Sequence, residues 1–253
     1  QRPRAGSGYP HRNTTRIDDV AIDEAPVRES TPMIDLKIEE RRIELQHYEP
    51  HATVEDLIAA LEAIRRRPGL RTATCHLCGE CCGDLVPVLG IDIDPLCRRL
   101  DCNRETLFAH VLTLPEPPDL EERHGAIESL RRDFDLARET ATLLYEYNNA
   151  EPLTFQRHAS GVCTLQHKLL CTIYGSHPTA CRFYLCNMGD RLSALYENIV
   201  RQGVWHSYVE AGWVPATDVS HNPFLHAHTL STLTLEAFDV DLSAAMESLF
   251  FYF

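Results

Sequence analysis

Residues 75–82 read CHLCGECC and place four thiols within eight positions. A second run, residues 161–186, reads GVCTLQHKLLCTIYGSHPTACRFYLC and supplies four more thiols. Short Cys-x2-Cys loops suit metals because the thiolates can converge on one ion while backbone amides point at the sulfurs. Gly79 and Gly83 permit the tight turns that such a loop needs. The two runs therefore predict a metal site at the place where they meet.

Two other roles compete with metal ligation for these eight cysteines. The chain has ten cysteines, an even number that leaves disulfides open. However, no secretory signal is visible, and a Cys-x2-Cys bridge is strained. Core packing is the ordinary role of a single cysteine, but eight thiols in two tight groups argue against it. We predict as metal ligands Cys75, Cys78, Cys81, Cys82, Cys163, Cys171, Cys181 and Cys186.

The other candidate residues have simpler interpretations. Cys97 and Cys102 lie apart from both runs among apolar neighbours, and we interpret them as core thiols. Arg182 follows Cys181 directly, and we predict that it contacts the cofactor and offsets the negative charge of the thiolates. The histidines of HNPFLHAH, residues 221–228, are interpreted as surface or capping residues rather than as a separate metal site.

The spacing of the thiols does not identify the metal. Four thiolates suit Zn²⁺ and an iron–sulfur cluster equally well. The adjacent side chains of Cys81 and Cys82 tend to diverge, so one of them is expected to serve a second site or a larger cluster. A zinc ion with four protein ligands would be structural, since no position is left open for a substrate. An iron–sulfur cluster would instead allow electron transfer.

The two runs resemble the YkgJ-type cysteine-cluster family, which comprises zinc- or iron-chelating, iron–sulfur-containing proteins. The resemblance covers about residues 75–190 and rests on CHLCGECC, on CTIY at 171–174 and on PTACR at 178–182. DIDPLCRRLDCNRETLFAHVL also looks like the helical insert of that family. His177 departs from the pattern, because the family usually has arginine before this proline.

The resemblance implies an iron–sulfur cofactor, most simply a [4Fe–4S] cluster. A related cysteine cluster occurs in flagellin lysine N-methylases, where the implied cofactor is also an iron–sulfur cluster. The first functional hypothesis is therefore a protein that holds an iron–sulfur cluster or iron and acts in redox chemistry, as an oxidoreductase, or in protein modification. The alternative is a zinc-stabilised interaction module, for example a subunit of a larger assembly.

Composition restricts the partners of the chain. Its net charge of −13 argues against binding to nucleic acid or to an anionic membrane surface. No apolar run approaches the roughly 20 residues of a membrane-spanning helix, so we expect no membrane insertion. No signal peptide is visible either, and the expected location is the cytoplasm. The expected partner or substrate is another protein.

The fold class predicted from the periodicity of apolar residues is mainly α. We expect one helical domain, in which two irregular cysteine-rich loops meet at a metal site, with little β-structure. Residues 1–35 are predicted to be a flexible or arm-like extension, and residues 36–253 a single domain whose metal-binding core is 75–190. A helix is expected at 53–67, where Thr53 and Asp56 fit a capping box and are followed by an apolar stripe. Short helices are expected at 94–100, with Asp94 as N-cap, and at 103–111, with Asn103 as cap. One long helix is expected at 120–148 because a single apolar stripe runs along it, and others at 191–211 and from about 230. A short strand is expected at 85–89.

Overall fold

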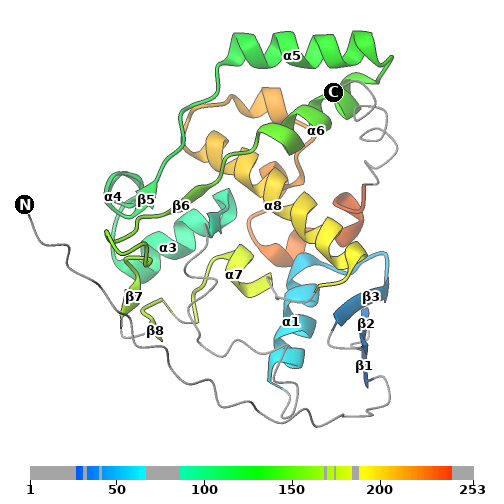
Figure 1. Cartoon of the computed structure of the whole chain (residues 1–253), viewed down its shortest axis with the longest axis vertical. Helices are drawn as coiled ribbons and strands as arrows, with labels where there is room; N and C mark the ends of the chain where they lie inside the picture. Colours follow the sequence, from blue (N-terminus) through cyan, green and yellow to red (C-terminus); the bar gives the residue numbers. More distant parts are fainter. Residues whose placement is uncertain are drawn as a thin grey trace, which may run out of the picture.

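The computed structural model of the chain describes residues 27–30, 33–39, 42–66, 86–167, 170–173, 175–183 and 188–240. Within these ranges the chain forms seven α-helices and three small antiparallel sheets (Figure 1). The prediction of a mainly helical fold is confirmed. None of the helices in these ranges combines the length and the apolar character that a membrane crossing requires.

A three-stranded sheet precedes the first helix. Its strands are β1 (Val27–Ser30), β2 (Ile34–Glu39) and β3 (Arg42–Tyr48), in that spatial order. Apolar residues alternate along β2 and β3, which gives the sheet one buried face that packs against α1. Residues 27–30 and 34–35 thus belong to a sheet, although the sequence predicted an extension through residue 35. The alternation of apolar and polar residues from Ile34 onwards is the sequence signal for β2.

Helix α1 (Val54–Arg65) begins at the capping box that the sequence predicts. The Thr53 hydroxyl accepts a hydrogen bond from the Asp56 amide at 3.2 Å, and the Thr53 amide donates to the Asp56 carboxylate at 2.9 Å. These bonds satisfy backbone donors that a helix N-terminus otherwise leaves unpaired. The predicted apolar stripe is buried, with Leu57, Leu61 and Ile64 fully inaccessible to solvent.

The middle of the chain follows the expected order, with small shifts of boundary. A 3-10 turn, η1 (Gly90–Asp92), leads directly into α3 (Ile93–Leu100), so Asp94 lies inside the helix and does not cap it. Helix α4 (Arg104–His110) is capped by Asn103 as predicted. The expected strand is β4 (Pro87–Val88), which pairs with β6 (Leu153–Phe155); β6 also pairs with β5 (Leu112–Thr113).

The single helix predicted at 120–148 is wrong, because the structure has two. Helix α5 (Leu120–Asp133) and helix α6 (Arg138–Asn149) pack against each other. Asp135 adopts a left-handed conformation, with φ of 49°, and reverses the chain between them. Asp tolerates this region better than most residues, so the break carries neither the Gly nor the Pro that usually marks one.

Helix α8 (Asp190–Glu210) forms the centre of the molecule and is flanked by α6, β3 and β4 (Figure 1). Its Trp205 side chain is fully buried, and the indole donates to the Glu146 carbonyl at 2.9 Å. After α8 the chain continues through four 3-10 turns, η2 (Ala216–Val219), η3 (Pro223–His226), η4 (Leu230–Thr232) and η5 (Leu235–Ala237). The last two stand where the sequence predicts an α-helix.

Gly90 in η1 lies close to α8, because it has no side chain. A substitution at this position therefore tests the packing of η1 against α8. A Cβ at this position would lie 2.3 Å from His206 Nδ1 and 2.9 Å from the His206 carbonyl carbon on α8. Gly90→Ala is therefore expected to destabilise the fold by about 1–3 kcal/mol, as overpacking of a core does. Gly125→Ala in α5 is the matched control, since nothing lies within 4 Å there.

The control substitution is expected to stabilise the chain by about 0.5–1 kcal/mol through helix propensity alone. Urea denaturation of both variants measures the two changes. If both variants changed the free energy of unfolding by a similar amount, Gly90 would not be in close contact with α8.

Candidate metal centre

Helix α7 (Thr179–Phe183) carries two of the predicted site residues, Cys181 and Arg182, and packs against both α1 and β4. At the C-terminal end of α1, Arg65 Nη2 donates a hydrogen bond to the Cys181 carbonyl at 3.4 Å. The first cysteine run lies in the chain between α1 and β4. The elements on either side of this run, α1 and β4, therefore both contact α7.

Asp92 fixes the start of α7. Its Oδ1 accepts hydrogen bonds from the Thr179 amide at 2.9 Å and the Thr179 hydroxyl at 2.7 Å. Its Oδ2 accepts one from the Leu89 amide at 3.1 Å. Asp92 thus caps the N-terminus of α7, although it lies far from α7 in the sequence and most capping side chains belong to the helix terminus itself. Burial raises the pKa of Asp92 to about 6.

The half-buried Arg182 side chain is held by two carboxylates of α1. Its Nη2 lies 2.7 Å from Glu55 Oε1, and its Nε lies 3.3 Å from Glu62 Oε1. Nη1 also approaches the second Glu55 oxygen at 3.3 Å, so the contact with Glu55 is bidentate. These pairs hold the guanidinium against α1, and its predicted contact with a cofactor stays a prediction.

His177 precedes α7 and is half-buried in the same region. Burial, and then the positive charges of Arg65 and Arg182, lower the pKa of His177. The imidazole is therefore neutral at physiological pH, and neutral imidazole is the form that binds a metal ion. His177 is thus a potential metal ligand four positions before Cys181.

Cys171 lies on a separate hairpin, formed by β7 (Gln166–His167) and β8 (Leu170–Cys171), and Cys163 precedes this hairpin and forms a β-bridge with Arg157. Gln166 pairs with Cys171 across the hairpin and donates its amide hydrogen to the Cys163 carbonyl at 3.0 Å. Arg99 of α3 donates to the Thr172 carbonyl at 2.6 Å, and so ties the residue after Cys171 to α3.

The predicted set of eight ligands lies only partly within the described residues. Cys75, Cys78, Cys81, Cys82 and Cys186 lie outside them. In the part of the chain that the structure describes, no three Cys, His, Asp or Glu side chains are grouped closely enough to hold a metal ion. The convergence of the two cysteine runs on one site therefore stays a prediction.

Several residues around α7 had no signal in the sequence. Asp92 lies 87 positions before its partner Thr179, and Glu55 lies 127 positions before Arg182. Glu55 belongs to no quoted motif, and the stretch that begins at Asp92 does not indicate a contact with Thr179, so only the folded structure brings either acid to α7. Comparison of the chain with protein-family models, with curated proteins and with solved structures finds no match. The resemblance to the YkgJ-type family accordingly rests on the quoted motifs alone.

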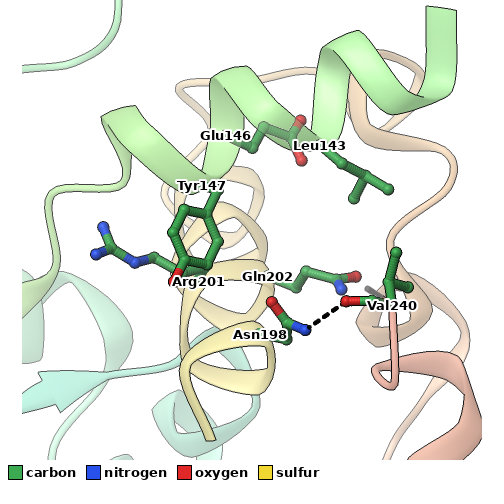
Figure 2. Close-up of a pocket in the computed structure, with 7 residues that line it drawn as sticks. All are labelled: Leu143, Glu146, Tyr147, Asn198, Arg201, Gln202 and Val240. Atoms are coloured by element: carbon green, nitrogen blue, oxygen red, sulfur yellow. Dashed lines mark hydrogen bonds between the residues drawn. The ribbon is translucent and has the colours of Figure 1, made fainter. Parts of the chain in front are cut away.

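A shallow cleft elsewhere in the described region is lined by α6, α8 and Val240 (Figure 2). Neither helix carries a predicted ligand, and two of the polar side chains of the cleft, Asn198 and Glu146, already have partners. Asn198 donates to the carbonyls of Phe238 and Val240, and the Glu146 carboxylate contacts Arg123 at 2.7 Å and His221 at 2.9 Å. We therefore interpret the cleft as a packing feature. His221, which the sequence placed at the surface or at a helix cap, contacts the Glu146 carboxylate.

The buried Asp92 carboxylate predicts a pH dependence of stability. Its pKa of about 6 in the folded state exceeds the ordinary value of 3.8, so the folded chain binds this proton more tightly than the unfolded chain. The stabilisation is complete below roughly pH 4 and is lost as the pH rises through roughly 6. A shift of this size corresponds to a free energy on the order of 3 kcal/mol.

Asp92→Asn is expected to remove this component. The difference between the unfolding free energies of the wild type and the variant, measured in urea at several pH values, should fall as the pH rises from roughly 4 to 6. Parallel curves for the two proteins would contradict a raised pKa for Asp92.

Proposed function

We propose that this chain is a metal-binding protein that holds an iron–sulfur cluster through its two cysteine runs and acts in redox chemistry or protein modification. The observation that carries the proposal is the packing of α7 against the C-terminal end of α1 and against β4. Cys181 lies on α7, and the first cysteine run joins α1 to β4 along the chain. The chain on either side of that run thus leads to an element that packs against α7.

The charges around α7 support a site for an anionic group. Thiolates bound to iron carry negative charge, and hydrogen bonds and nearby cations tune the potential of such a cluster. Arg65 donates to the Cys181 carbonyl, and Arg182 follows Cys181 in the chain and on α7. Glu55 and Glu62 orient Arg182 and offset part of its charge. When bound, an iron–sulfur cluster would supply electron transfer, while these residues position α7.

A zinc-stabilised interaction module is the second candidate, and His177 is the observation that favours it. Its imidazole is neutral, half-buried and four positions before Cys181. Three thiolates and one imidazole form a common structural zinc site. In this case the metal would hold loops that a protein partner contacts.

Metal analysis of the full chain, purified without oxygen, tests the proposal. We expect a brown protein that absorbs near roughly 400 nm and contains iron with a matching amount of acid-labile sulfide. A colourless protein with zinc would favour the second candidate, because Zn²⁺ has a filled d shell. A chain with neither metal at stoichiometric level would contradict both.

A further inference from the structure

The C-terminal turn of α3 brings together the two cysteines that lie outside both runs. Asp101 ends the helix in a left-handed conformation, with φ of 51°. The Cys102 amide then donates to the Cys97 carbonyl at 3.0 Å. This hydrogen bond is that of a Schellman motif, in which the first and last residues of the turn commonly bring their side chains into contact. Here both of those residues are cysteines.

The two thiols are neighbours. Burial, and then the charge and the hydrogen bond of the adjacent Cys102 thiol, raise the pKa of Cys97. Both side chains pack against the core but are only half-buried. The interpretation of these residues as core thiols thus holds for their packing, but the sequence did not indicate that they face each other or that solvent reaches them.

A disulfide fits this pair better than a metal ion does. Cysteines can be bridged when their Cα atoms are about 4.4–6.8 Å apart, and the hydrogen bond of the turn holds two backbones at a comparable spacing. The charged groups nearby are Asp94 and Arg104, which pair with each other. Within the described residues, no third ligand joins the two thiols to form a metal site.

We propose that Cys97 and Cys102 form a reversible disulfide by exchange with a small-molecule disulfide such as oxidised glutathione. One protein thiolate attacks the small disulfide, forms a mixed disulfide and releases one small thiol. The second protein thiolate then attacks the protein sulfur of that mixed disulfide and releases the second small thiol. The two protein sulfurs are oxidised, and the two small thiols carry off both electrons and protons.

The bond would lock the corner between α3 and α4. Arg99 lies between the two cysteines in this turn and donates to the Thr172 carbonyl, next to Cys171. Oxidation would therefore stiffen the segment that holds the β7–β8 hairpin. The proposal is independent of which metal, if any, the cysteine runs bind.

Peptide mapping of the full chain tests the proposal. The metal-containing protein is treated with oxidised glutathione without oxygen, quenched in acid and alkylated. Trypsin cuts after Arg98 and Arg99, and acid cleaves the labile Asp94–Pro95 bond, so Cys97 is separated from the first cysteine run. We expect the peptide PLCR, residues 95–98, joined to LDCNR, residues 100–104, with both thiols of the pair protected from alkylation.

The variants Cys97→Ser and Cys102→Ser are matched controls. Each lacks the second thiol, so the remaining cysteine should stop at the mixed disulfide with glutathione. For Cys102 we expect at least about tenfold more of this mixed disulfide in Cys97→Ser than in the wild type. A wild-type chain that also stops at the mixed disulfide, remains unmodified, or joins LDCNR to another cysteine would overturn the proposal.

Discussion

Replacing either Cys75 or Cys171 by serine is expected to remove about half or more of the metal bound by the purified chain. Eight predicted ligands suffice for two sites of four thiolates each, so the loss of one ligand should empty at least one site. Serine is nearly isosteric with cysteine but is a poor ligand for soft metals. Iron, zinc and sulfide per chain, measured on protein purified without oxygen, give the result.

Cys97→Ser is the matched control for these variants. Cys97 faces Cys102 in the turn after α3 and is not a predicted ligand, so its replacement should leave the metal content unchanged. Circular dichroism would show whether each variant keeps its helices, because loss of a structural metal can unfold a region. Loss of metal from Cys97→Ser, or normal metal in Cys171→Ser, would contradict the division of the ten cysteines into eight ligands and two others.

The helices that the sequence predicted well are those with a capping side chain at the N-terminal end. The capping box of Thr53 and Asp56 marks the start of α1, and Asn103 marks the start of α4. The boundary between α5 and α6 has no such signal, because Asp135 rather than glycine takes the left-handed conformation. The apolar stripe that continues from one helix into the next then favours one long helix.

The arrangement around α7 could not be predicted for a different reason. Its contacts join residues that are far apart in the chain, as in the pairs Asp92–Thr179 and Arg182–Glu55. Local patterns carry no information about such pairs, whereas the cysteine spacing does indicate chemistry. The sequence therefore predicts the kind of site and its ligands, and the structure supplies the side chains that orient α7.

Arg123→Met is expected to destabilise the fold by about 3–5 kcal/mol, the usual cost of removing one partner of a buried ion pair. Arg123 of α5 lies 2.7 Å from Glu146 of α6, and their side chains are only 1% and 3% exposed. The guanidinium also donates to the Asp218 carbonyl at 3.0 Å and lies 5.2 Å from the centre of the Trp205 ring. Without it, Glu146 would keep a buried charge with His221 as its remaining ionisable partner.

Two further variants separate the buried charge from simple loss of packing. Arg131→Met removes an exposed ion pair with Glu128 on the same helix, and should cost less than about 1 kcal/mol. The double variant Arg123→Met/Glu146→Leu leaves no uncompensated charge, so it should be more stable in urea than Arg123→Met alone. If Arg123→Met costs no more than Arg131→Met, or if the double variant shows no recovery, the contact between α5 and α6 does not depend on this pair. A large cost for Arg123→Met with recovery in the double variant would identify the Arg123–Glu146 pair as a polar contact that holds α5 against α6. Such a contact stabilises two packed helices rather than the single long helix that the apolar stripe favours.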